Sequence, residues 1–199
     1  MSTRGCFGVR VDEVDHLMYN HSDSYLGWLG VELVRQIRTA DLKEWKRKAR
    51  ELKGIDDEGA APTPEEIERL HEIVWPADHG IGGKRYELYR PMQGNLGMML
   101  NTGFYLRANE FMRDSLFCEW AYVVNLDTQK LEIYRGGQHK RHKQGRYATV
   151  KASYPKSRSK LTSSYWPVAL IAEYDLKTVS EADIRALDAE IASKEETCA

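Results

Sequence analysis

Apolar and polar residues alternate at the start of the chain, and this pattern predicts a β-hairpin. In residues 3–11 the side chains of Phe7, Val9 and Val11 fall on one side of a strand. A short second strand is predicted for residues 16–20, and the mainly acidic residues between the two strands form the turn.

Apolar residues spaced three and four apart then predict a helical insert from about residue 31 to residue 74. The first helix begins near Val31. Asp41 is placed to cap a second helix, and Thr63 followed by Pro64 is placed to start a third. The apolar stripe of the second helix consists of Leu42, Trp45, Ala49 and Leu52.

The second half of the chain predicts another hairpin, a buried strand and a last helix. Residues 119–125 and 130–135 form the hairpin around a four-residue turn. Residues 166–174 are predicted as the strand. Ser180 caps the last helix, and the tail after Ser193 is predicted to be frayed.

Strand pairs separated by runs of helix predict an α+β fold, with residues 1–199 in a single layered domain. The chain contains no internal repeat and no linker long enough to separate two domains. The predicted core consists of Phe7, Val9, Val11, Leu33, Ile37, Trp45, Tyr122, Val124, Leu131, Ile133, Val168, Leu170 and Leu187.

Composition narrows the class of protein. With 42% hydrophobic and 30% charged residues, the chain is typical of a soluble globular protein, and no apolar run is long enough to predict a membrane helix. The N-terminus has no apolar signal segment, and three scattered cysteines predict no disulfide framework. We therefore expect a cytoplasmic protein with no cofactor, and the net charge of −1 indicates no particular partner.

The motif YNHSDSY, residues 19–25, concentrates groups that can transfer protons. Asn20, His21 and Asp23 lie at the end of the first hairpin, and Arg4 lies on its other strand. A guanidinium group can bind a substrate carboxylate or phosphate. One hypothesis is therefore a hydrolase that acts on an amide or ester of a small-molecule substrate.

Cys6 is the first candidate nucleophile. If the turn is centred between Glu13 and Val14, Cys6 faces His21, which would lower the pKa of the thiol, and Asp23 would orient the imidazole. A shift by one residue would place the two side chains on opposite faces. The alternative is that Cys6 is a small core residue and the motif a polar strand end.

Two parts of the sequence resemble a family of uncharacterised proteins from bacteria, phages and fungi. The pattern T-R-G at residues 3–5 is followed by Y-N-H-x-D-S-Y at residues 19–25, then by L-G at residues 29–30. The later hairpin at 119–134 is similar too, and the middle of the chain is unmatched. Leu26 stands where the family has proline. The resemblance implies no particular activity.

Ser2 is the second candidate nucleophile. Removal of the initiator methionine would leave Ser2 with a hydroxyl group and an α-amine that can act as its own base. Asp23 and Ser24 ahead of Gly27 faintly resemble a turn of the amidotransferase branch of N-terminal-nucleophile hydrolases. Most proteins with a serine at this position use it for no catalysis.

Metal and phosphate sites are weakly indicated. His16, His21, Asp23 and His79 could supply ligands, but their spacing is not distinctive, so no metal site is predicted. The glycine-rich residues 80–85 lack the first glycine and the hydroxyl residue of a P-loop.

A basic segment supports the rival hypothesis, a non-enzymatic module that binds nucleic acid or a protein partner. Residues 135–160 contain nine Lys or Arg residues and no acid. Cations and aromatic rings together are what single-strand binding requires. The alternative is a solvated loop balanced by the acidic C-terminal helix. The candidate contacts are Lys140, Arg141, Lys143, Arg146 and Tyr147.

Overall fold

A mixed five-stranded sheet forms the centre of the molecule in the computed structural model, which describes residues 3–56, 58–73, 84–150 and 165–197. The strand order is β2-β1-β5-β6-β7. The α+β fold class predicted from the sequence is confirmed. The strands are β1 (Gly5–Val11), β2 (Val14–Asn20), β5 (Trp120–Asn125), β6 (Lys130–Arg135) and β7 (Ala169–Asp175).

Both predicted hairpins are present, and they meet through a parallel pair. Strand β1 pairs with β5 in parallel, whereas β1–β2, β5–β6 and β6–β7 are antiparallel. The parallel pair brings the turns of the two hairpins together. As a result, Asp127 Oδ2 in the second turn accepts a hydrogen bond from the backbone N–H of Glu13 in the first turn at 3.0 Å.

The predicted register of the first hairpin is wrong. The turn contains only Asp12 and Glu13, which have φ values of 48° and 65°, so Val11 pairs with Val14. Two residues with positive φ make a tight turn whose twist matches that of the strands. Strand β2 therefore begins at Val14, two residues earlier than predicted.

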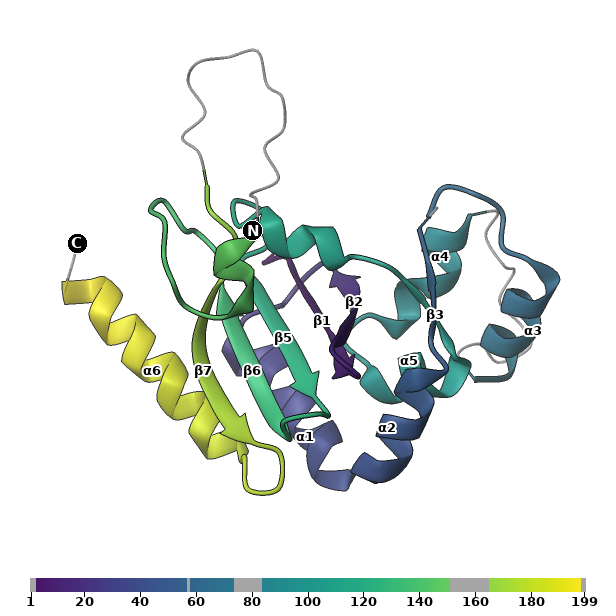
Figure 1. Ribbon diagram of the computed structural model, residues 1–199, viewed down its shortest axis with the longest axis horizontal. Helices are drawn as coiled ribbons and strands as arrows, with labels where there is room; N and C mark the ends of the chain where they lie inside the picture. Colours follow the sequence, from purple (N-terminus) through teal and green to yellow (C-terminus); the bar gives the residue numbers. More distant parts are fainter. Residues whose placement is uncertain (1–2, 57, 74–83, 151–164, 198–199) are drawn as a thin grey trace, which may run out of the picture.

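Both faces of the sheet are buried. Phe7, Val9 and Val11 share one face of the sheet, as predicted, and lie in the larger core cluster. Cys6 and Val123 belong to a smaller cluster on the opposite face. In Figure 1, α6 runs beside β7, and α3 lies at the opposite end of the molecule.

The helices begin where local capping signals predicted them. Asp41 accepts hydrogen bonds from the backbone N–H groups of Lys43 and Glu44, and Thr63 and Glu66 form a reciprocal capping box. The α-helices are α1 (Val31–Thr39), α2 (Leu42–Arg50), α3 (Pro64–Ile73), α4 (Arg85–Tyr89), α5 (Leu96–Thr102) and α6 (Glu181–Thr197).

Shorter helical turns join these elements. A π-helical turn, η1 (Leu26–Gly30), leads into α1. The 3-10 turns are η2 (Arg90–Met92), η3 (Asn109–Arg113) and η4 (Arg146–Thr149).

The predicted insert is not entirely helical. Strand β3 (Lys53–Ile55) follows α2 and pairs in parallel with β4 (Phe104–Leu106), forming a separate two-stranded sheet. Three-residue strands carry almost no periodic signal, and their pairing is non-local. Residues 84–103, for which the sequence predicted no helix or strand, contain α4 and α5.

The C-terminal part differs from the prediction at both ends. Trp166 donates its backbone N–H to Gln138 O outside the sheet, and β7 begins only at Ala169. Helix α6 continues past Ser193 to Thr197 instead of fraying. Among the predicted core residues, Trp45, Leu170 and Leu187 are only partly buried, and the others are buried.

None of the helices in the described part of the chain has both the length and the apolar character needed to span a membrane.

Candidate functional site

Part of the YNHSDSY motif is structural. Asn20 and Ser24 are buried, and Nδ2 of Asn20 donates a hydrogen bond to Ser24 Oγ at 2.8 Å. The backbone N–H of Ser24 donates to Thr3 O at 3.1 Å. A Cβ on Gly5 would lie only 2.7 Å from the Cβ of Ser24. Residues 3–5 therefore pack against the motif at residues 19–25, and the close contact with Ser24 requires glycine at position 5.

The rest of the motif faces a hollow of about 300 Å³, here called the motif hollow. His21, Ser22 and Asp23 are exposed and line it. Asp23 has a φ of 55°, a left-handed conformation that is uncommon outside glycine and recurs at functional sites. The other walls include Trp28, Leu29, Glu32, Arg90, Gln93 and Gly94.

His21 is fixed by neighbours other than Asp23. Its Nδ1 lies 3.2 Å from the hydroxyl oxygen of Tyr19. Its backbone N–H donates to Gln93 Oε1 at 2.9 Å. The Asp23 side chain makes no hydrogen bond or ion pair with a described residue. The predicted orienting contact between Asp23 and His21 is therefore not formed.

The predicted pairing of Cys6 with His21 is wrong. Because the turn is shorter than predicted, Cys6 pairs with Tyr19 instead. Its side chain is fully buried, and its Sγ lies 3.2 Å from Met112 Sδ and 3.9 Å from Cys118 Sγ. Burial raises the pKa of the Cys118 thiol. These thiols lie in the smaller core cluster and away from the motif hollow, as the alternative interpretation expected.

The other predicted catalytic residues are not all brought together. The guanidinium carbon of Arg4 lies 5.7 Å from the ring centroid of Phe117, and Arg4 does not line the motif hollow. Ser2 lies outside the described residues. The motif hollow therefore collects Asn20, His21 and Asp23 from the predicted set, without Arg4 or Cys6.

The weak metal pattern does not assemble in the described part of the chain, where no three His, Cys, Asp or Glu side chains form a group suited to a metal ion. Nδ1 of His16 lies 3.1 Å from the hydroxyl oxygen of Tyr105, and burial lowers the pKa of this imidazole. His79 lies outside the described residues.

The end of the glycine-rich stretch takes part in a buried polar contact. Residues 80–83 lie outside the described residues, but Arg85 forms an ion pair with Glu66 at 2.9 Å. Tyr89 also donates its hydroxyl to Glu66 at 2.9 Å. Burial raises the pKa of Glu66, but hydrogen bonds from Arg85, Thr63 and Tyr89 outweigh this effect and lower the pKa below its ordinary value. This contact joins α3 to α4.

The basic segment is divided by its structure, and its first part is exposed. Lys140, Arg141 and Lys143, here called the basic surface, lie in the loop after β6. None of the three cations forms an ion pair with a described residue. Residues 151–160, which contain four further cations of the segment, lie outside the described residues.

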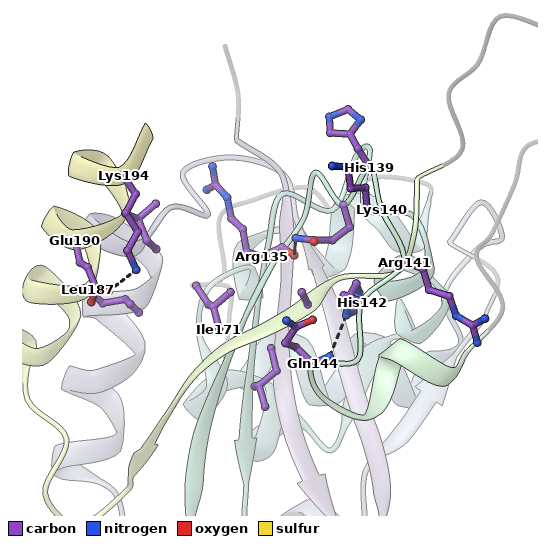
Figure 2. A pocket seen from close by; sticks show the side chains of 14 residues that line it. Arg135, His139, Lys140, Arg141, His142, Gln144, Ile171, Leu187, Glu190 and Lys194 are labelled. Atoms are coloured by element: carbon purple, nitrogen blue, oxygen red, sulfur yellow. Dashed lines mark hydrogen bonds and ion pairs between the residues drawn. The ribbon is translucent and has the colours of Figure 1, made fainter. Parts of the chain in front are cut away.

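A hollow of about 720 Å³, here called the basic hollow, lies between this loop, β7 and α6. Figure 2 shows Leu187, Glu190 and Lys194 on α6 facing Ile171 and Arg135, whereas Arg141 extends outward on the other side. Two smaller hollows adjoin it. One shares Arg135 and His139 with the basic hollow, and the other shares Arg141 and His142.

The second part of the basic segment points into the protein. Nη2 of Arg146 donates to Asp15 Oδ1 at 2.8 Å, and Nη1 of Arg146 also forms an ion pair with Glu132. The hydroxyl of Tyr147 donates to Asp15 Oδ2 at 2.6 Å, and only 8% of Tyr147 is exposed. Arg146 and Tyr147 therefore use their polar groups inside the protein, in contrast to the exposed cations of the basic surface.

The aromatic neighbours of the basic surface were not predicted. The ring of Tyr165 lies 4.5 Å from that of His139, and the guanidinium carbon of Arg141 lies 5.7 Å from the ring centroid of Trp166. Both aromatic residues are partly exposed. Because Trp166 directly precedes an apolar run, the sequence analysis placed it in a buried strand. The sequence contains no local signal that they return to the loop.

Comparison of the chain with protein-family models, with curated proteins and with solved structures finds no match.

Proposed function

We propose that the protein is a binding module for single-stranded nucleic acid, which it holds on the basic surface. The observation that carries this proposal is the set of exposed cations, Lys140, Arg141 and Lys143, without an acidic partner among the described residues. No Asp or Glu occurs between Glu132 and Glu173. Phosphate groups can therefore approach this loop without repulsion from a carboxylate in the same segment.

Partly exposed aromatic rings beside the cations favour a single strand over a duplex. Tyr165 lies next to His139, and Trp166 lies next to Arg141. Unpaired bases stack on aromatic side chains, and this contact is sequence-tolerant. Bases inside a duplex are not available for such stacking. The adjoining hollows provide space around the loop for the sugar and base groups.

The experiment is a fluorescence anisotropy titration of a labelled single-stranded oligonucleotide at several salt concentrations. Each phosphate contact contributes about −0.7 to the slope of log affinity against log salt for a single strand. Replacing Lys140, Arg141 and Lys143 together with Ala should therefore weaken binding at low salt and flatten the slope by about two units. Trp166→Ala should weaken binding with little change in slope, since stacking releases few ions.

The matched control replaces Lys43, Arg47 and Lys48 on α2 with Ala. This variant removes the same formal charge, but Arg47 and Lys48 form ion pairs with Glu44 on their own helix. It should retain the parent slope. Equal effects of the two triple variants would refute the basic surface as the site. Competition by polyglutamate as strong as by the oligonucleotide, with no effect of Trp166→Ala, would instead indicate an acidic protein partner.

A further inference from the structure

We infer that the motif hollow is a second, separate binding site, and that its ligand is a neutral saccharide ring. The inference is independent of the basic surface. At about 300 Å³ the hollow is at the small end of the range for ligand pockets, which is about 300–1,000 Å³. Its walls contain an exposed indole and several planar polar side chains, the combination that suits the apolar face and the hydroxyl groups of a sugar.

Trp28 provides the apolar platform, because 63% of this side chain is exposed. It lies in the π-helical turn η1, in which Leu26 and Leu29 are buried and fix the orientation of the turn. Single π-helical turns occur frequently at functional sites. The indole is a large, rigid surface with a polar N–H, so the C–H face of a sugar can stack on it at a small entropic cost.

Asn20 provides, in the wall of the hollow, an acceptor that has no donor among the described residues. It is 6% exposed, and its Nδ2 donates to Ser22 O at 2.5 Å and to Ser24 Oγ at 2.8 Å. Its Oδ1 receives no hydrogen bond from a described residue. Buried polar atoms normally have a partner. A ligand hydroxyl is a suitable donor for Oδ1.

Gly94 leaves the approach to this acceptor open. A Cβ at this position would lie 3.8 Å from Asn20 Oδ1 and 3.4 Å from a methyl carbon of Leu29. The φ of Gly94 is +78°, so the chain can follow this path without strain only at glycine. The missing side chain therefore preserves space directly beside the unpartnered oxygen.

The charges around the rim favour a neutral ligand. The Asp23 carboxylate and the Arg90 guanidinium each line the hollow without a hydrogen bond or ion pair to a described residue. Glu32, a second carboxylate, accepts a hydrogen bond from Gln36 Nε2 at 3.3 Å. Carboxylates repel phosphate, and a guanidinium repels an ammonium group. Vicinal hydroxyl groups satisfy both kinds of side chain because each hydroxyl donates and accepts.

Internal contacts hold the walls in place before a ligand binds. Gln93 Oε1 accepts the backbone N–H of His21 at 2.9 Å, which joins the motif to the segment before α5. Gln36 Nε2 donates to Gly94 O at 2.9 Å, and Gln36 Oε1 accepts the N–H of Leu96 at 2.8 Å. A preorganised site loses little free energy to ordering on binding.

The test is saturation-transfer NMR and calorimetry on the whole protein with glucose, galactose, mannose, N-acetylglucosamine, maltose and cellobiose as probes. At least one of them should bind with a Kd in the millimolar range, with saturation transferred to its ring C–H groups. Trp28→Ala should weaken this binding about tenfold or more, whereas Trp28→Phe should retain part of it. Because Trp28 is exposed, neither variant should unfold the protein.

Gly94→Ala tests the space beside Asn20 Oδ1, and Arg90→Ala tests the charged rim of the hollow. Each variant should also weaken binding. Phe117→Ala is the matched control, since Phe117 is exposed but lies outside the hollow, and it should leave binding unchanged. Failure of all six sugars to bind would overturn the inference. Unchanged affinity in Trp28→Ala, or displacement of the bound sugar by inorganic phosphate, would overturn it too. None of these results affects the proposal for the basic surface.

Discussion

Arg141 and Arg146 belong to one basic segment, but the structure gives them opposite roles. Arg141 is exposed beside Trp166 and forms no ion pair with a described residue. Arg146 is largely covered and contacts Asp15 and Glu132. A run of like charges in a sequence is therefore not one surface, because acids distant in the sequence can neutralise some of its members.

The inner arginine joins three elements. Asp15 lies on β2, Glu132 on β6 and Arg146 at the start of η4. Burial alone would lower the pKa of Arg146, but the neighbouring Tyr147 and Asp15 raise it overall, so the guanidinium remains charged. The Glu132 side chain is 5% exposed, so few water molecules can replace Arg146 as its partner. Arg146 therefore acts in stability, whereas Arg141 is free to act in binding.

The largest expected effect is on the stability of Arg146→Ala. Removal of one partner from a buried ion pair leaves an uncompensated charge and typically destabilises a protein by about 3–5 kcal/mol. We expect a loss of about that size in the free energy of unfolding, measured by urea denaturation. Arg141→Ala is the matched control and should leave stability unchanged. Equal stability of the two variants would contradict the division of the segment.

Tyr147→Phe should have the next largest effect. It removes only the hydroxyl that donates to Asp15 Oδ2 at 2.6 Å. Hydrogen bonds to charged groups contribute about 1.5–3 kcal/mol, so we expect a destabilisation of about 2 kcal/mol in the same assay. Tyr165→Phe should have no effect, because Tyr165 is partly exposed and contacts His139 through its ring. Weaker oligonucleotide binding by Tyr147→Phe without loss of stability would show that the phenol contacts the ligand instead.

Local signals predicted the fold elements well. The cap residues Asp41 and Thr63 act within one turn of their helices, so the sequence around them was sufficient. The turn at Asp12 and Glu13 was not recognised, because tight turns with two positive φ values usually contain glycine. The parallel pairing of β1 with β5 and of β3 with β4 depends on contacts between distant segments, which no short pattern encodes.

The candidate sites were predicted only in part, for the same reason. The motif is a dense polar cluster, and it does line a hollow, but Arg90 and Gln93 come from a segment with no recognisable pattern. Asn20 and Ser24 could not be told apart from reactive groups until the hydrogen bond between them and the packing of Ser24 against Gly5 were known. The acidic partners of Arg146 likewise come from strands that precede it in the chain.

The smallest expected effect concerns Asp127. Its ion pair with Lys46 lies near the surface and can be compared with the buried ion pair of Arg146. Asp127 lies in the second hairpin turn and accepts hydrogen bonds from the backbone N–H of Glu13 and from Lys46 Nζ at 2.9 Å. Burial raises the pKa of this carboxyl, but these hydrogen bonds outweigh it and lower the pKa to about 2, from an ordinary value of 3.8.

The lowered pKa means that the folded state binds the Asp127 proton more weakly than the unfolded chain does. The stabilisation is therefore complete at pH values above the ordinary pKa of 3.8 and disappears as the pH falls toward about 2. Because solvent screens this pair, Asp127→Asn should destabilise the protein at neutral pH by only about 1 kcal/mol or less. Urea denaturation of parent and variant from neutral pH down to about pH 3 should show the difference shrinking with acidity. A difference that stays constant or grows over this range would show that Asp127 stabilises the turn through its shape and not through its charge.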